Sequence, residues 1–181
     1  MFTRSFGKMA TAITTTLTAS VLMTAAPAPA QAAAAVRVLG PNPAACNAGS
    51  DGAAALVRVH GFKDRKGQVR VQVYPGDPKK FLEKGEWIER VDVPLTRSGD
   101  MDVCVKLPAP GDYAMVVMHD RGKNGKLDPF SDGAGLPGNP DMKLAKPDYD
   151  MANFRAKPGV TPMTIVLNYR RGLLGFGPVG D

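Results

Sequence analysis

The chain has 181 residues, and its 23 Lys and Arg against 17 Asp and Glu give a formal net charge of +6. Basic and acidic residues are interleaved, as in GDPKKFLEKGEWIER, whereas a nucleic-acid surface would gather Lys and Arg on one face with stacking aromatics. The charge pattern therefore argues against a nucleic-acid partner.

Residues 1–32 have the layout of a secretory signal peptide. Arg4 and Lys8 precede an uncharged apolar stretch from 10 to 26, and the small-residue run APAPAQAAAA follows. A membrane anchor is the alternative, but the stretch is rich in Thr and Ala and falls short of the roughly 20 strongly apolar residues that a span needs. We expect an exported protein, periplasmic or secreted, with no membrane span after cleavage. The mature chain of about 150 residues suits one domain with a real core.

Residues 33–53 are rich in Ala, Pro, Asn and Gly and are expected to form a flexible N-terminal arm. The arm contains Cys46, and the other cysteine, Cys104, lies in MDVCVKL. In a strand, Val103 and Val105 would share one face and Cys104 would point to the other. An even cysteine count in an exported protein favours a disulfide. We predict a Cys46–Cys104 bond that fastens the arm across a sheet, with two free thiols as the alternative.

From residue 54 to 172 the apolar residues recur with a period of two, which indicates β-strands. LVRVHGF and QVRVQVY form the first pair, with KDRKG between them as a predicted hairpin turn. Five more candidate strands follow: WIERVDVPL, MDVCVKL, DYAMVVMHD, MANFRA and MTIVLNYR. DYAMVVMHD is apolar on both faces, so we expect it at the centre of a sheet that is covered on both sides.

Seven short strands with Pro- and Gly-rich turns predict an all-β fold, a seven-stranded antiparallel β-sandwich over residues 54–172. Residues 173–181 contain glycines without alternation and are expected to form a loose C-terminal tail. About thirty residues between DYAMVVMHD and MANFRA show no regular pattern. Loops of that length are usually functional or disordered.

This long loop opens with a possible calcium site. Counted from Asp120, oxygen-bearing side chains stand at positions 1, 5 and 9 (Asp120, Asn124 and Asp128), and the Lys126 carbonyl stands at position 7. Asp132 follows position 12, so several oxygens could point toward one weakly held Ca²⁺, the one cofactor that the sequence suggests. Missing ligands and neighbouring Lys and Arg residues oppose a cation. The alternative is a turn in which the Asp and Asn side chains cap their own backbone.

The pair His119–Asp120 supplies the one catalytic alternative, an enzyme accessory or a weak hydrolase. Neighbouring residues of a strand point to opposite faces, however, and no serine lies in a nucleophile-elbow context. We therefore expect a non-enzymatic protein without catalytic residues.

Three stretches in order, LVRVHGFKDRKGQVRVQVY, LPAPGDYAMVVMHDRGKNGKLD and VTPMTIVLNYRRGL, resemble the DUF2141 family of small exported bacterial proteins over about 54–172. PGDYAMVV is also similar to the strand entry of transthyretin-like and carboxypeptidase-regulatory-like sandwiches. The resemblance implies an Ig-like or prealbumin-like β-sandwich and no catalytic residue. The family's loop pattern, Asp-x-Asn-x-Asn-Gly-Lys-x-Asp, is matched here except that Gly122 replaces the first Asn.

These observations together predict an exported module of the cell envelope with a structural or binding role. Its expected partner is a protein or an envelope polymer, contacted through the long loop and a sheet edge.

Overall fold

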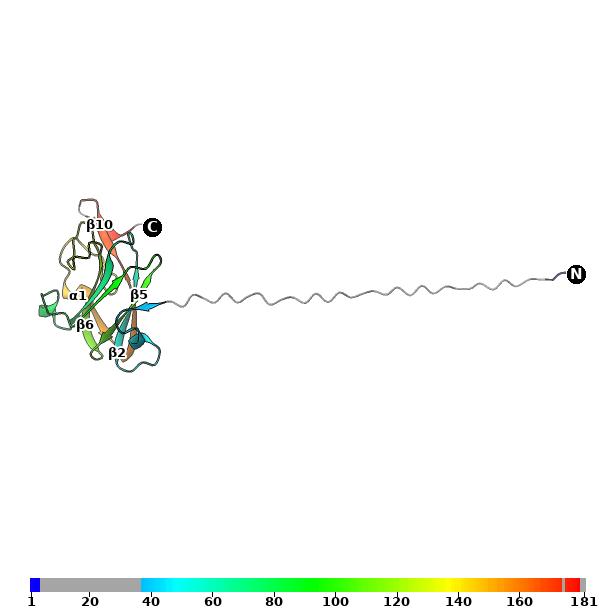
Figure 1. Ribbon diagram of the computed structural model, residues 1–181, viewed down its shortest axis with the longest axis horizontal. Coiled ribbons are helices and arrows are strands. Elements are labelled where there is room, and N and C mark those ends of the chain that lie inside the picture. The colour runs from blue at the N-terminus through cyan, green and yellow to red at the C-terminus, as the bar shows by residue number, and fades with distance from the viewer. Residues whose placement is uncertain (4–36, 174, 180–181) are drawn as a thin grey trace. The chain divides into compact units, whose positions relative to one another are not determined.

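The computed structural model describes residues 1–3, 37–173 and 175–179. Residues 4–32 of the predicted signal peptide lie outside this part of the chain, so export stays a prediction. Among the described residues, no helix is long and apolar enough to cross a membrane. The regular structure runs from Val38 to Pro178 and consists almost entirely of strands (Figure 1).

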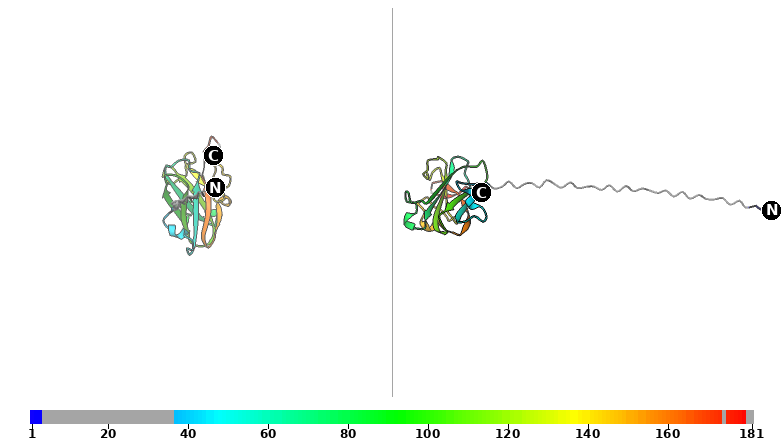
Figure 2. Two further views of the ribbon diagram at one scale, coloured as in Figure 1. Left: turned by 90° about the vertical axis from the view of Figure 1, so that its right-hand side faces the viewer. Right: turned by 60° about the horizontal axis from the view of Figure 1, so that its bottom comes forward.

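The strands form two sheets, which Figure 2 shows from two further directions. The smaller sheet has the order β1-β5-β2-β9, formed by Val38–Leu39, Met101–Leu107, Ala53–His60 and Gly159–Val166. The larger sheet has the order β11-β10-β7-β6-β3-β4, formed by Gly175–Pro178, Asn168–Arg171, Gly133–Gly135, Gly111–Asp120, Gln68–Pro75 and Glu89–Pro94. β8 (Asn153–Ala156) joins the larger sheet by pairing with β6. Three short helical pieces connect strands: η1 (Pro43–Cys46), η2 (Pro78–Lys80) and α1 (Tyr149–Ala152).

The main hydrophobic core lies between the sheets because each strand turns its alternate apolar residues inward. Eight valines from the two sheets are completely buried there: Val57, Val59, Val69, Val71, Val73, Val103, Val105 and Val117. They belong to one connected cluster that contains side chains of both sheets. The predicted all-β sandwich is confirmed.

The sandwich differs in detail from seven antiparallel strands. Eleven strands are described, and β1 pairs with β5, and β2 with β9, in parallel. The predicted last strand divides at Leu167 into β9 and β10, which lie in different sheets. β1, β7 and β11 are short segments without alternation, and β11 lies where a loose tail is expected. In β7, a side chain at Gly133 would clash with the Tyr169 ring. The backbone of this strand can therefore lie close to Tyr169 only because residue 133 is a glycine.

The connection between β2 and β3, residues 61–67, crosses from the smaller sheet to the larger one, so the hairpin predicted at KDRKG does not form. β2 pairs with β5 and β9, whereas β3 pairs with β4 and β6. Alternation with a period of two shows which face of a strand is buried but not which strand lies beside it. The predicted positive φ of Gly67 is present, at +88°.

Residues 37–53, the described part of the expected flexible arm, lie against the smaller sheet. β1 pairs with β5, and η1 contacts β2, β5 and β9. Cys46 is bonded to Cys104 as predicted, with their Cα atoms 5.9 Å apart. The disulfide and the β1 pairing order a segment whose composition alone indicates flexibility.

The outer face of the larger sheet carries a second hydrophobic cluster. Its buried members are Tyr74, Phe81, Ala114, Leu136 and Ala152. The segment 78–87 and the loop 136–152 supply the side chains that pack onto β3 and β6 from outside. β6 is therefore covered on both sides, as its doubly apolar sequence predicts.

The same loop covers part of one edge of the smaller sheet. The side chain of Asn139 donates to the Thr164 carbonyl at 2.9 Å and accepts from the Val166 N–H at 2.7 Å. β9 is the end strand of this sheet. The Asn139 amide therefore pairs with backbone groups that would otherwise lack a protein partner.

We expect the disulfide to stabilise the domain chiefly by restricting the unfolded chain. It joins residues 58 positions apart, a loop for which the chain-entropy model gives roughly 4 kcal/mol. Replacing Cys46 and Cys104 together by Ala should lower the free energy of unfolding in urea by about that amount. Reduced wild-type protein is the matched control and should unfold like the double variant. Equal midpoints for oxidised and reduced wild type would show that the bond adds no constraint.

Candidate functional site

Asp120, the first residue of the predicted calcium loop, ends β6 and is completely buried. Its carboxylate accepts from the backbone N–H groups of Asn124 at 3.1 Å and Gly125 at 2.9 Å, and from Gln68 Nε2 at 3.1 Å. Burial raises the pKa of Asp120, but the hydrogen bonds from Gly125 and Gln68 outweigh it and hold the pKa below its ordinary value. The ionised carboxylate thus fixes the turn that follows β6.

Asp132 fastens the other end of this loop and is also buried. Its carboxylate accepts from the backbone N–H groups of Arg121 at 3.0 Å and Asp128 at 2.9 Å. Asp128 Oδ1 accepts from the N–H of Phe130, two residues further on. This last contact is an Asx turn, in which a side chain caps its own backbone.

Asn124, a further predicted ligand, also caps its own backbone, and an arginine lies beside this part of the loop. Asn124 Oδ1 accepts from the Lys126 N–H at 2.8 Å, and the Arg70 guanidinium donates to the Gly125 carbonyl at 2.7 Å. Within the described ranges, no group of three or more His, Cys, Asp or Glu side chains is placed to hold a metal. A cation would have to displace amide hydrogens and lie beside a guanidinium. The arrangement fits the turn alternative better than a calcium site.

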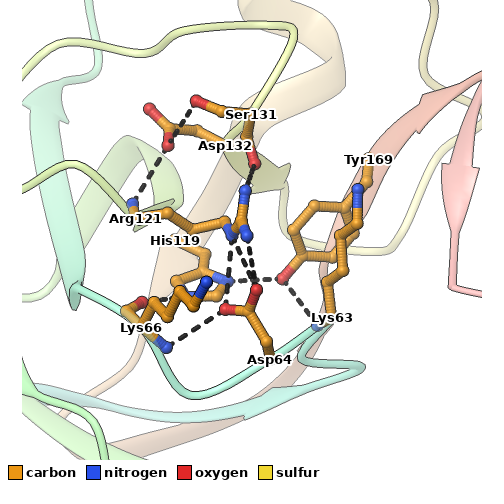
Figure 3. Close-up of polar contacts among 8 residues, drawn as sticks. All are labelled: Lys63, Asp64, Lys66, His119, Arg121, Ser131, Asp132 and Tyr169. Carbon is orange, nitrogen blue, oxygen red and sulfur yellow. Dashed lines mark hydrogen bonds and ion pairs between the residues drawn. The ribbon is translucent and has the colours of Figure 1, made fainter.

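His119 lies at the centre of a buried polar cluster (Figure 3). Its Nδ1 lies 2.7 Å from the Tyr169 hydroxyl, and its Nε2 lies 2.7 Å from the Lys66 carbonyl oxygen. Because a carbonyl only accepts, Nε2 carries the hydrogen and Nδ1 accepts from the hydroxyl. The Tyr169 oxygen in turn accepts from the Lys63 N–H at 3.2 Å. This chain of hydrogen bonds joins β6 and β10 to the crossover 61–67.

An ion pair completes the cluster (Figure 3). Arg121 Nε lies 3.2 and 3.1 Å from the two carboxylate oxygens of Asp64, and Nη2 also contacts this carboxylate. The hydrogen bond from Arg121 lowers the pKa of Asp64 to about 2. Arg121 Nη1 also donates to the Ser131 carbonyl at 3.0 Å. The crossover and the loop after β6 are therefore fastened to each other.

The hydrogen bonds of this cluster hold the chain segments together. Burial lowers the pKa of His119 and raises the pKa of Tyr169 to about 12, so both side chains are neutral near pH 7. Both ring nitrogens of His119 are engaged, and the single hydrogen of the Ser131 hydroxyl is shared between the carboxylates of Asp128 and Asp132, at 3.1 and 3.2 Å. The hydrolase alternative gains no support from this geometry.

A groove of about 660 Å³ lies on the outer face of the larger sheet. It is bordered by segment 82–87 and by the loop 125–147. Its apolar lining residues are Leu82, Trp87, Val116, Met118, Leu127, Pro129, Ala134, Leu136, Met142, Leu144, Ala145, Pro147 and Phe176. The volume falls within the roughly 300–1,000 Å³ that is usual for small-molecule sites.

The polar lining of this groove is strongly basic. Its charged residues are Arg70, Lys84, Arg90, Lys126, Lys143 and Lys146 against the single acid Glu83. The Arg90 guanidinium lies over the Trp87 ring, 3.7 Å from its centroid. Sequence reasoning missed this site because polar residues that alternate with valines look like a solvated face. The doubly apolar pattern of β6 was the signal that this face is covered.

Comparison with known proteins gives one family. The model of the family described as uncharacterized protein conserved in bacteria (DUF2141) matches residues 57–164. The match runs from within β2 to within β9 and so includes the crossover, the loop after β6 and most of the groove. No curated protein and no solved structure matches the chain.

We expect Asp120→Ala to destabilise the protein equally with and without calcium. The substitution leaves buried amide donors without an acceptor, and a loss of about 1–3 kcal/mol in the free energy of unfolding follows. Thermal and urea unfolding in millimolar calcium and in excess EDTA measure the effect, with the exposed Asp51→Ala as a matched control. A saturating stabilisation of wild type by calcium that Asp120→Ala abolishes would instead establish a cation site.

We expect buried His119 to make stability decrease as the pH falls below about 6.5. Its folded pKa is lowered, chiefly by burial, with Asp64 and Asp132 raising it and Arg121 lowering it. As the pH falls, His119 is therefore protonated at a higher pH in the unfolded chain than in the folded one. The free energy of unfolding should be unaffected above pH 6.5 and fall below it by at most about 1.4 kcal/mol per pH unit.

Urea unfolding at a series of pH values between 7 and 5 tests this expectation. His119→Gln should lose this part of the pH dependence, whatever its absolute stability. His60→Gln, at the other histidine of the chain, should keep it. Parallel pH profiles for wild type and His119→Gln would contradict the assignment of the effect to His119.

Proposed function

The chain belongs to the DUF2141 family, whose members are described only as uncharacterized bacterial proteins, and we propose that it is a non-enzymatic binding protein of the cell envelope. The groove on the outer face of the larger sheet is the proposed site. Its ligand is a small molecule with an apolar body. The observation that carries the proposal is a volume of about 660 Å³ above the apolar residues of β6 and β7.

The floor of the groove is made by strands and is therefore rigid. β6 contributes Val116 and Met118, and β7 contributes Ala134. These strands pair with their neighbours along the sheet, which fixes the positions of their side chains. An apolar ligand on this floor removes apolar surface from water, which stabilises the complex by about 25 cal/mol per Å².

The walls of the groove come from two segments outside the strands. These are segment 82–87 and the loop 142–147, and Lys146 of the loop pairs with Glu83 of the segment at 3.1 Å. Both partners of this pair are more than half exposed, so the pair contributes little stability. The walls are held mainly by the hydrophobic cluster around Phe81 and Leu136.

The shape of the site and the disulfide both support this assignment. A concave apolar site suits a small molecule, whereas the protein or polymer partner expected from the sequence would need a broader surface. The Cys46–Cys104 bond supports an exported location, because disulfides persist in oxidising compartments.

We expect the neutral apolar dye N-phenyl-1-naphthylamine to bind in the groove. Trp87, the one tryptophan of the chain, lines the groove, so binding should change its fluorescence as well as that of the dye. Leu144→Asp should weaken binding about tenfold or more, because it replaces an apolar contact worth roughly 1.5–3 kcal/mol by a charge.

The matched control is Leu173→Asp. Leu173 is 82% exposed and does not line the groove, so this variant should bind the dye like wild type. Absence of saturable dye binding to the wild-type protein would refute the proposed function.

A further inference from the structure

We propose that the ligand of the groove is a long-chain carboxylate, with its carboxylate bound by Arg90 and its aliphatic chain lying on β6 and β7. The inference rests on the proposed function, because it specifies the ligand of the same groove. Three observations carry it: the polarity of the floor changes from one end to the other, Arg90 is held in place with two nitrogens available, and the lining has excess positive charge.

The register of the larger sheet places polar and apolar side chains in rows. Gln72 pairs with Arg90 on one side and with Val116 on the other, so these three residues lie in one row across β4, β3 and β6. The next row runs from Asp92 on β4 through Arg70 and Met118 to Ala134 on β7. In both rows the residues on β3 and β4 are polar, whereas those on β6 and β7 are apolar.

This polarity fits a molecule with a charged head and an apolar tail. β4 and β7 are separated by β3 and β6. With neighbouring strands about 4.8 Å apart, the floor extends about 14 Å from the strand of Arg90 to that of Ala134. An extended aliphatic chain crossing the strands would therefore leave its head group at Arg90 and cover the apolar half of the floor.

Arg90 is positioned before any ligand arrives. Its guanidinium lies 3.7 Å from the centroid of the Trp87 ring, and its Nε donates to Gln72 Oε1 at 2.9 Å. Gln72 Nε2 in turn contacts the Tyr74 hydroxyl, which ties the amide to the sheet. Over residues 37–173 and 175–179, no protein acceptor binds the terminal nitrogens of Arg90. Two parallel N–H groups on a planar guanidinium match the two oxygens of one carboxylate.

The other lining residues add positive charge around the Arg90 guanidinium. Two of its six basic residues are neutralised, Arg70 by Asp92 at 2.7 Å and Lys146 by Glu83 at 3.1 Å. In the part of the chain that the structure describes, the other four have no carboxylate partner. An excess of basic groups over an apolar floor attracts anionic amphiphiles and disfavours cationic ones.

Displacement of N-phenyl-1-naphthylamine from the full-length protein by matched dodecyl compounds tests the assignment. Dodecanoate should bind at least tenfold more tightly than dodecan-1-ol, and dodecyltrimethylammonium should bind more weakly than either. The advantage of dodecanoate should shrink as salt is added, because the attraction is between charges. Dodecyl phosphate is included to separate a carboxylate site from a phosphate site.

Variants of Arg90 test whether this residue binds the carboxylate head group. Arg90→Gln should remove most of the tighter binding of dodecanoate relative to dodecan-1-ol. Arg90→Lys keeps the charge but loses the two-nitrogen contact, so it should retain part of this difference in affinity. Arg97→Gln removes the same charge from an exposed residue outside the groove and should bind like wild type. Unchanged selectivity in Arg90→Gln would overturn the inference.

Other outcomes separate this inference from the proposed function. Equal binding of dodecanoate and dodecan-1-ol would overturn the carboxylate site and leave an apolar binding protein. Tighter binding of dodecyl phosphate than of dodecanoate would overturn the carboxylate in favour of a phosphate head. If the neutral dye itself does not bind, the proposed function fails, and the inference fails with it.

Discussion

Strand β6 needs cover on both of its faces, and much of the remaining structure follows from that requirement. Its inner side chains, among them Met115 and Val117, fill the space between the sheets. Its outer side chains, Ala114 and Val116, would be in water without the segments 78–87 and 136–152. These segments bury Ala114 completely and leave Val116 partly exposed. The groove is the part of the outer face that this cover leaves open.

The side of the molecule where β6 ends is organised by a different constraint, the satisfaction of buried polar groups. The crossover 61–67 connects the two sheets. At its backbone, buried His119 donates to the Lys66 carbonyl and buried Tyr169 accepts from the Lys63 N–H. Arg121 extends the same network into the loop after β6 through Asp64 and the Ser131 carbonyl. That loop also supplies one rim of the groove, so the buried network sets the position of a wall of the binding site.

The fold was predictable from alternation where strands have valines on one side, as in QVRVQVY. The partners of those strands were not, because the crossover 61–67 has the composition of a hairpin turn. β7 could not be predicted, because its Gly-Ala-Gly sequence has no apolar alternation. Its glycines are explained by the close packing of the Tyr169 ring, which only the structure shows. In the loop at 120–132 the sequence shows the carboxylate and amide oxygens but not their hydrogen-bond donors. Most of these donors are backbone N–H groups, which every residue type except proline has. The groove could not be predicted from the sequence, because Gln72 and Arg90 become neighbours only through the register of β3 and β4.

The edge of the smaller sheet has a consequence for how copies of this protein meet. An uncovered end strand offers its N–H and C=O groups to any other chain, which is a common route to aggregation. On β9, the side-chain amide of Asn139 forms hydrogen bonds with the C=O of Thr164 and the N–H of Val166. Pro162, two residues before Thr164, lies on the same side of the strand and has no N–H to offer. An approaching strand therefore finds neither a continuous row of donors nor one of acceptors. Two residues, Asn139 and Pro162, thus protect the β9 edge of the smaller sheet against intermolecular β-pairing without a further strand.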